Sequence, residues 1–113
     1  MRELEVRRAP LGVVLCMGPF NYPLNETFTT LIPALVMGNT VILKHASQTL
    51  QVGERLAEAF HRAGVPEDVF QNVVIDHDTT NTVIASRAVD FVNFTGSVGG
   101  GQAMEKAAAG TFI

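Results

Sequence analysis

The chain has 113 residues, is 47% hydrophobic and carries a net charge of −3 at pH 7, which suits one globular domain with its own hydrophobic core. It has no basic cluster and no apolar run of transmembrane length, so neither nucleic acid nor a membrane is an expected partner. Its single cysteine, Cys16, excludes an internal disulfide and is typical of a cytoplasmic protein.

The first predicted element is a buried strand. Residues 12–17 form a continuous apolar run, which is the pattern of a strand covered on both faces. Residues 24–36 then show apolar side chains at helical spacing. Pro33 should bend this helix or mark its last turn, and Gly38 follows as a stop signal.

A second strand and helix repeat the pattern. Residues 40–43 have the composition of a buried strand. The helix that follows ends at Gly64, with Glu58 and Arg62 spaced to pair on its solvent side. The side chains expected on its buried face are Val52, Leu56, Phe60 and Ala63.

The rest of the chain continues this alternation. We expect a strand, a short helix, a strand and a further clear helix, at residues 69–75, 79–86, 89–94 and 99–109. Residues 4–8 are a candidate edge strand. Strands that alternate with helices predict an α/β fold: a doubly wound, mostly parallel (Rossmann-like) sheet with helices on both faces, in one domain over residues 1–113.

Three segments should meet at one edge of this sheet. Ligands of open parallel sheets bind outside the carboxyl ends of the strands. Asn21 lies beyond the first strand, Lys44 directly follows the second, and Thr95-Gly96-Ser97 follow the last. An amide, a lysine and a glycine-rich turn together suit an anionic, nucleotide-like ligand.

Each of these features also has a purely structural interpretation. The turn from Phe94 to Gly101 joins a strand to a helix, so its free amides favour phosphate, and Ser97 can cap the helix or donate to phosphate. It lacks the G-x-G-x-x-G pattern, however, and such turns are about as often mere packing. Lys44 could simply reach solvent at a strand end.

The stretch MGPFNYPLN (residues 17–25) is the most unusual part of the sequence. A turn needs glycine, proline and asparagine for backbone reasons, but it does not need two aromatic residues around the asparagine. The segment is therefore either a packed turn or a rigid loop that presents the Asn21 amide to a ligand.

Taken together, these motifs resemble the aldehyde dehydrogenase family over nearly the whole chain. No single motif is specific, but their order and spacing are. The matching segments are PLGVV (10–14), PFNYP (19–23), IPAL (32–35), GNTVILK (38–44), AGVP (63–66) and FTGS (94–97).

The resemblance implies a role for particular residues. Asn21 matches the asparagine whose amide donates to the oxyanion of the thiohemiacetal intermediate, an arrangement that needs a rigidly held donor. Lys44 matches the lysine that contacts the adenosine ribose. The segment beneath the pyrophosphate is matched by Gly96, Ser97 and Gly101, and we count Phe20 and Ser47 among the candidate cofactor contacts.

The implied reaction is the NAD(P)-dependent oxidation of an aldehyde to an acid through a thioester. In that family the nucleophilic cysteine and the general-base glutamate come later in the chain. We therefore expect residues 1–113 to be the cofactor-binding part of a longer, homo-oligomeric enzyme, and to be inactive alone. Cys16 lies inside the first strand and is expected to be a core residue.

The cofactor is expected to be NADP or NAD. Ser47 stands where many members of the family have a glutamate that binds the ribose 2′-hydroxyl, and a missing acid removes a repulsion against a 2′-phosphate. His45 is expected to point away from Lys44, and we assign it no role. The three histidines lie far apart on different elements, so no metal site is predicted.

Two other functions remain open at this point. The chain could be a non-catalytic nucleotide-binding module, or part of a relative that reduces an acyl-CoA or acyl phosphate. The Phe20-Asn21-Tyr22 turn favours the dehydrogenase, because a plain binding module needs no oxyanion donor. The identity of the aldehyde is not readable from these residues.

Overall fold

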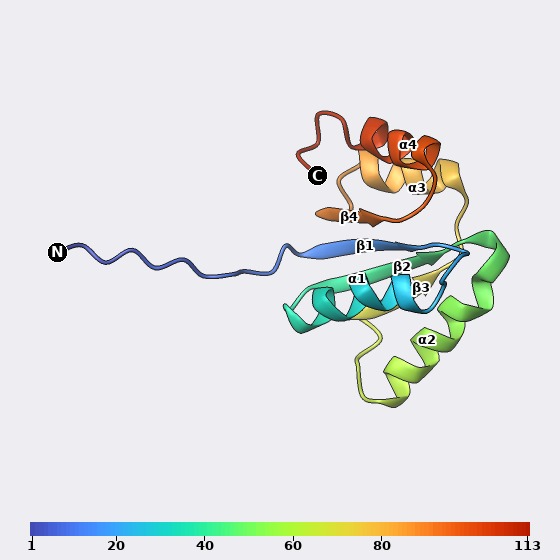
Figure 1. Ribbon diagram of the computed structural model, residues 1–113, viewed down its shortest axis with the longest axis horizontal. Helices are drawn as coiled ribbons and strands as arrows, with labels where there is room; N and C mark the ends of the chain where they lie inside the picture. The colour runs from blue at the N-terminus through green and yellow to red at the C-terminus, as the bar shows by residue number, and fades with distance from the viewer.

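The computed structural model describes residues 1–113 and contains a four-stranded sheet between two pairs of helices (Figure 1). The strand order is β3-β2-β1-β4, and every neighbouring pair is parallel. The strands are β1 (Val13–Gly18), β2 (Thr40–His45), β3 (Phe70–Val73) and β4 (Phe91–Phe94). The helices are α1 (Asn25–Val36), α2 (Leu50–Arg62), α3 (His77–Ala85) and α4 (Val98–Ala108), with a 3-10 turn at Ser47–Thr49.

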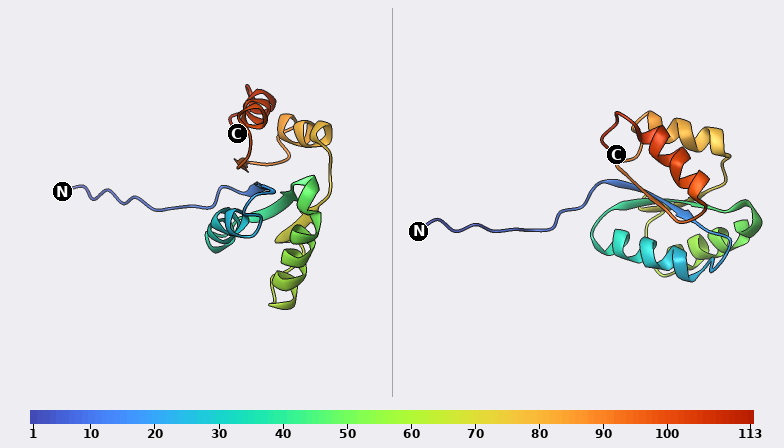
Figure 2. Two further views of the ribbon diagram at one scale, coloured as in Figure 1. Left: turned by 45° about the vertical axis from the view of Figure 1, so that its right-hand side comes forward. Right: turned by 45° about the horizontal axis from the view of Figure 1, so that its top comes forward.

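Helices cover both faces of the sheet, as Figure 2 shows from two further directions. On one face, Val14 and Cys16 of β1 pack with residues of α1 and α2, including Leu31 and Leu56. On the other, Leu15 and Met17 pack against α3 and α4. Successive side chains of a strand point to opposite faces, so a strand buried on both sides must be apolar throughout. The predicted doubly wound parallel sheet is confirmed.

The predicted edge strand at residues 4–8 is wrong. Residues 1–11 form no strand, and Figure 1 shows them running away from the sheet. The reason lies in β1, whose two sides are already paired with β2 and β4. The alternating Leu4 and Val6 therefore have no sheet edge beside them, and both are exposed.

Several element ends differ from those predicted. The strands β3 and β4 are shorter than expected because each lies at an edge and pairs with one neighbour over only four residues. The strand β2 runs two residues further, to His45, because β1 pairs with it as far as Gly18. Pro33 lies in the last turn of α1, as expected.

The helix ends follow the expected chemistry. Ser97 caps α4 by accepting a hydrogen bond from the Gly100 N–H at 3.1 Å. Gly64, just after α2, has a φ of +104°, a conformation that side chains rarely adopt. Arg62 lies 4.0 Å from Glu58, which also pairs with Arg55 at 3.0 Å. These exposed ion pairs contribute little to stability.

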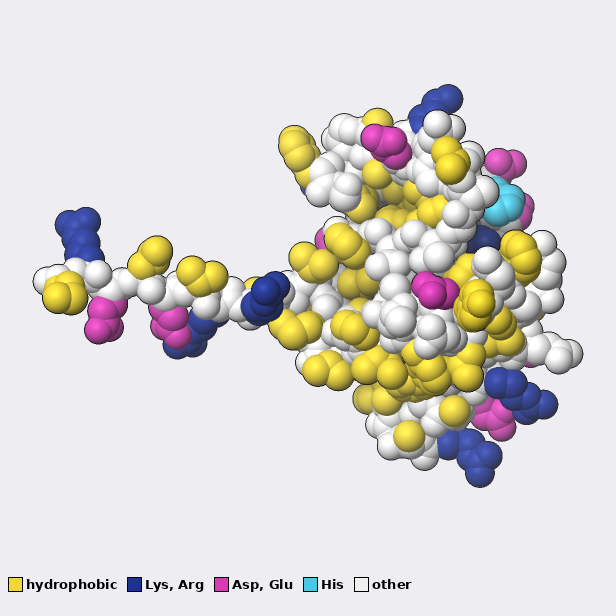
Figure 3. All heavy atoms as spheres, viewed as in Figure 1, with side chains coloured by type: hydrophobic (Ala, Val, Ile, Leu, Met, Phe, Trp, Pro, Cys, Tyr) yellow, Lys and Arg dark blue, Asp and Glu magenta, His cyan; other side chains and the backbone are white.

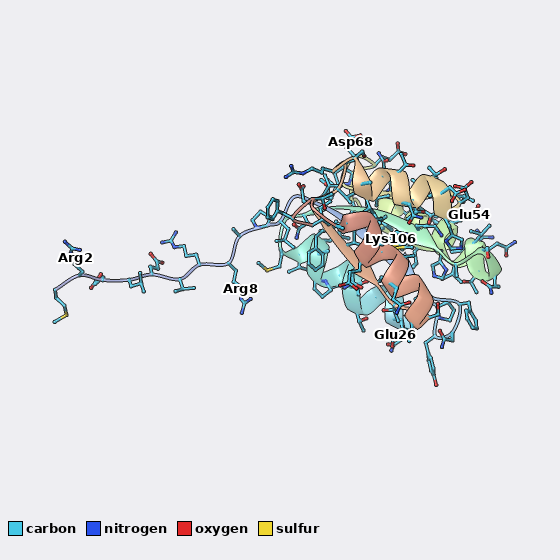
Figure 4. All side chains as sticks on the ribbon, turned by 90° about the horizontal axis from the view of Figure 1, so that it is seen from above. Arg2, Arg8, Glu26, Glu54, Asp68 and Lys106 are labelled. Atoms are coloured by element: carbon cyan, nitrogen blue, oxygen red, sulfur yellow. The ribbon has the colours of Figure 1, made fainter.

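The outer surface is mixed in character. Figure 4 shows the labelled Asp68 and Glu54 toward the outline of the domain and Lys106 on α4 facing the viewer, with Arg2 and Arg8 along the extended N-terminal segment. Hydrophobic side chains gather on the visible face over α1 (Figure 3), and Ile32 and Val36 are exposed there. None of the helices has the length and apolar character needed to cross a bilayer.

Asn39 joins the start of the sheet to the end of α1. Its side chain is only 5% exposed. The Oδ1 atom accepts hydrogen bonds from the N–H groups of Leu11 and Gly12, and Nδ2 donates to the Ala34 carbonyl at 2.9 Å. One buried amide therefore pairs two backbone N–H groups that have no other partner, and it adds a second hydrogen bond to the Ala34 carbonyl, which also accepts from the Asn39 backbone N–H at 3.1 Å.

We predict that Asn39→Ala lowers the free energy of unfolding by about 2–3 kcal/mol, because it removes three hydrogen bonds of a buried side chain and leaves the Leu11 and Gly12 N–H groups without a partner in the protein. Urea unfolding of the chain measures this. The matched control is Gln51→Ala, at an exposed position of α2, which should change the free energy by less than about 0.5 kcal/mol. Equal effects of the two substitutions would contradict the role of Asn39.

Candidate functional site

A pocket of about 500 Å³ lies at the carboxyl ends of the strands. Its floor is a row of three side chains from adjacent strands, Met17, Lys44 and Phe94. Met17 of β1 is paired in register with Lys44 of β2 on one side and with Phe94 of β4 on the other. The parallel register therefore places Lys44 directly beside Met17, with Phe94 on the other side of Met17, on the face of the sheet that α3 and α4 cover.

The structure brings five of the seven predicted site residues to this pocket. Phe20 and Asn21 come from the loop after β1, Lys44 comes from β2, and Gly96 and Ser97 come from the loop after β4. These are the three segments that the sequence predicts to converge at one edge.

Ser47 and Gly101 do not line the pocket. Ser47 is exposed in the 3-10 turn, where its Oγ lies 3.4 Å from Gln48 Oε1. Gly101 lies in the first turn of α4, behind the pocket, and a Cβ there would be 3.8 Å from the Phe94 ring.

Other residues line the pocket that the sequence did not single out. These are Gln48 and His77, which lie a few residues beyond β2 and β3. The signal for both is their position, because each follows the carboxyl end of a parallel strand. The prediction from the sequence considers only residues close to the strand ends, and it therefore does not include Gln48 and His77.

The loop after β1 presents the Asn21 side chain. Asn21 is exposed, and its side-chain amide makes no hydrogen bond within the protein. The loop is fixed on both sides of it: Pro19 is buried, and the Pro23 carbonyl accepts a hydrogen bond from Thr27 Oγ1 at 2.6 Å. Tyr22 has a φ of 52°, a left-handed conformation that is unusual for a bulky residue. The turn thus holds a free amide donor in a rigid frame.

Lys44 is the cation of the pocket. The residue is only 7% exposed. Burial lowers the pKa of its ammonium group, and the negative charge of Asp76 partly opposes that shift. An ammonium group that is partly desolvated and has no hydrogen-bond partner within the protein favours an anion or several oxygen acceptors beside it.

The N-terminus of α4 is open toward the pocket. Ser97 Oγ caps the Gly100 N–H, whereas the N–H groups of Val98 and Gly99 make no hydrogen bond within the protein. Free N–H groups at a helix N-terminus, together with the helix dipole, form a site for an anion such as a phosphate.

Two glycines of this turn are explained by packing. A Cβ at Gly96 would lie 2.6 Å from Phe94 Cζ, and one at Gly100 would lie 2.5 Å from it. The ring of Phe94 therefore fits against the bare backbone at both positions. The packing interpretation of the turn is thus supported, and it leaves the N–H groups of Val98 and Gly99 free.

Cys16 takes no part in the site. It is 1% exposed inside β1, and burial raises the pKa of its thiol, an effect that a hydrogen bond with Thr30 only partly offsets. A buried, protonated thiol is a poor nucleophile. No group of three or more metal-binding side chains is present anywhere in the chain.

A second, larger groove of about 790 Å³ lies elsewhere, between residues 6–9, α1 and β4. It is lined by none of the predicted site residues. The smaller pocket therefore carries the candidate chemistry.

A parallel, doubly wound sheet with a lysine, a free amide and an open helix N-terminus at its carboxyl edge defines a nucleotide-binding α/β domain. The model of the aldehyde dehydrogenase family matches residues 1–113. The chain belongs to the aldehyde dehydrogenase family.

Individual relatives agree with this assignment. The chain is 38% identical over 105 residues to an N-succinylglutamate 5-semialdehyde dehydrogenase of Sphingopyxis alaskensis, covering 93% of this chain and 22% of that protein. It is 43% identical over 93 residues to an NADP-dependent glyceraldehyde-3-phosphate dehydrogenase of Streptococcus equinus, covering 81% and 20%. The crystal structure of an NAD-dependent aldehyde dehydrogenase from Sinorhizobium meliloti is similar with a TM-score of 0.85 at 38% identity, covering 91% and 21%. The chain thus spans about a fifth of the length of these relatives.

The glycine pair in the turn after β4 gives a test of the packing. We predict that Gly96→Ala lowers the free energy of unfolding by about 1–3 kcal/mol, because the added methyl group displaces the Phe94 ring. In Gly99→Ala the methyl group meets open space, and the free energy should rise by about 0.5 kcal/mol, since alanine is the better helix former. Urea unfolding of both variants measures the difference, and a neutral Gly96→Ala would contradict the contact.

Proposed function

We propose that residues 1–113 are the cofactor-binding part of an NAD(P)-dependent aldehyde dehydrogenase. The observation that carries the proposal is the convergence of Asn21, Lys44 and the open N-terminus of α4 on one pocket. The cysteine nucleophile and the glutamate base belong, in this proposal, to other parts of the full-length protein. Its location is proposed to be the cytoplasm and its assembled state a homo-oligomer.

The residues present fit a dinucleotide. The pocket volume of about 500 Å³ is in the range of ordinary ligand pockets. Lys44 supplies a cation and up to three donors for ribose or phosphate oxygens. The free N–H groups of Val98 and Gly99 suit the pyrophosphate. When bound, the nicotinamide group of such a cofactor accepts a hydride from the substrate.

Asn21 is proposed to be a catalytic residue. Its side-chain N–H donates to the oxygen of the aldehyde, on which negative charge develops during attack by a nucleophile. Because the surrounding turn holds the amide before substrate arrives, the reaction does not have to reorganise the donor. The amide makes no competing hydrogen bond within the protein.

We propose that the enzyme accepts NADP, either in preference to NAD or alongside it. The loop after Lys44 carries no acidic residue before Glu54. The exposed hydroxyl of Ser47 stands in that loop, next to the pocket-lining residue Gln48. A neutral loop of this kind does not repel a 2′-phosphate. The relatives named above include one described as NADP-dependent and one as NAD-dependent.

The substrate is proposed to be a small polar aldehyde. The two curated relatives are named for N-succinylglutamate 5-semialdehyde and glyceraldehyde 3-phosphate, and both of those aldehydes are polar. The exposed Tyr22 beside Asn21 offers a hydroxyl group for such a substrate.

The role of Asn21 is tested in the full-length protein that carries this domain. Asn21→Ala should lower kcat about 100-fold, which is the usual cost of removing one oxyanion donor. The Kd of NAD(P) should change less than about twofold, because the cofactor does not depend on this amide. The control is Asn25→Ala, an exposed amide at the start of α1, and kcat within a few-fold of the parent for Asn21→Ala would make Asn21 only a turn residue.

Cofactor choice is tested at the loop after β2. Ser47→Glu should shift the ratio of kcat/KM values toward NAD by about tenfold, because a carboxylate repels a 2′-phosphate and accepts a hydrogen bond from a 2′-hydroxyl. Steady-state kinetics with both cofactors gives the ratio, and Ser47→Gln, which adds similar bulk without charge, is the control. A parent that uses only NAD, with an unchanged ratio in Ser47→Glu, would show that this loop does not select the cofactor.

A further inference from the structure

His45 is buried on the face of the sheet opposite the pocket. It is the last residue of β2 and only 2% exposed. The register places it beside Gly18, the last residue of β1. A Cβ at Gly18 would lie 2.7 Å from Cδ2 of the imidazole, so the ring packs directly on the bare backbone there. His45 does point away from Lys44, as the sequence suggested, but it is not without contacts.

Both ring nitrogens of His45 have partners. Nδ1 lies 3.1 Å from the Ala46 backbone nitrogen and 2.8 Å from Thr49 Oγ1. Nε2 lies 3.1 Å from the Pro23 carbonyl oxygen and 3.3 Å from Thr27 Oγ1. The imidazole therefore contacts two segments that lie far apart in the sequence, one with Pro23 and Thr27 and the other with Ala46 and Thr49.

Each ring nitrogen contacts a different segment. A carbonyl oxygen can only accept, so Nε2 donates to Pro23. Nδ1 is bonded to the Thr49 hydroxyl, and it also lies near the Ala46 N–H, whose shorter hydrogen bond goes to the Gly18 carbonyl at 2.9 Å.

Each of the two segments includes or adjoins residues that line the pocket. Pro23 closes the turn that presents Asn21. Thr49 closes the 3-10 turn, in which Gln48 lines the pocket. The ring thus joins the proposed oxyanion donor to the proposed cofactor loop from behind the sheet, without entering the pocket.

We propose that His45 is a positioning residue that sets where the Asn21 amide lies relative to the cofactor loop. This inference rests on the proposed function. The Nε2–H holds the Asn21 turn through the Pro23 carbonyl, and Nδ1 holds the cofactor loop through Thr49. The two contacts therefore affect different steps. The contact of Nε2 with Pro23 affects turnover, and the contact of Nδ1 with Thr49 affects cofactor binding.

Two substitutions in the full-length protein separate the role of the Nε2 contact from that of the Nδ1 contact. An asparagine side chain places its oxygen near the position of Nδ1 but does not reach Pro23. A glutamine side chain places its NH₂ group near the position of Nε2 but offers no acceptor at Nδ1.

His45→Asn should lower kcat about tenfold and leave the Kd of NADPH within twofold, because the turn that carries Asn21 is displaced while the loop after β2 is held. His45→Gln should raise the Kd of NADPH about fivefold and retain kcat within threefold.

The matched control is His61→Asn. His61 Nε2 donates to the Phe70 carbonyl at 2.7 Å, which is a bond of the same kind between α2 and β3, and His61 does not line the pocket. This variant should lose thermal stability and keep both kcat and Kd. A merely structural role of His45 would make the three variants alike in kcat and Kd.

Crystal structures of the parent and of His45→Asn supply a readout that does not depend on activity. The Asn21 turn should be displaced in the variant, while the 3-10 turn stays in place. A parent without aldehyde-dependent reduction of NAD(P) would overturn the proposed function, and the displacement of Asn21 and the NADPH titrations would still decide the role of His45. An unmoved Asn21, or a kcat of His45→Asn within twofold of the control, would overturn the inference.

Discussion

The parallel pairing of β1 with both β2 and β4 is the constraint on which the candidate site depends. Hydrogen bonds along the two ladders bring Met17, Lys44 and Phe94 into one row across three strands. A cation is thereby fixed beside Met17, in a row that is otherwise apolar, at the carboxyl edge of the sheet. Burial in that row lowers the pKa of the Lys44 ammonium, which is the physical reason why an oxygen-rich ligand stabilises the charged form.

The last residues of β1 and β2 form a second row, on the other face of the sheet. There Gly18 leaves room for the imidazole of His45, and the ring satisfies polar groups of two loops. Buried polar groups that are fully paired specify one arrangement of the chain, because any other arrangement leaves them unpaired. The same strand ends thus line the candidate pocket on one face and hold the two loops on the other.

Glycines at this edge of the sheet allow close packing, while the backbone N–H groups beside them keep no partner within the protein. Gly96 and Gly100 leave space for the Phe94 ring, and that packing places the start of α4 over the pocket. The N–H groups of Val98 and Gly99 are left free as a consequence of helix geometry, since the first turn of any helix has no intrahelical acceptors. A sequence pattern typical of a phosphate-binding turn thus also serves packing.

Local patterns in the amino-acid sequence were enough to predict the sheet, its parallel sense and the edge where the site lies. Apolar runs of strand length, helical spacing between them, and polar residues such as Asn21 and Lys44 just beyond the strands are all visible within short segments. The neighbours of each side chain, in contrast, depend on the assembled fold. The fold left residues 4–8 without a partner strand, set Ser47 outside the pocket, and gave His45 its contacts with two loops. These outcomes follow from strand register and from the approach of residues far apart in the chain, and no local pattern encodes either.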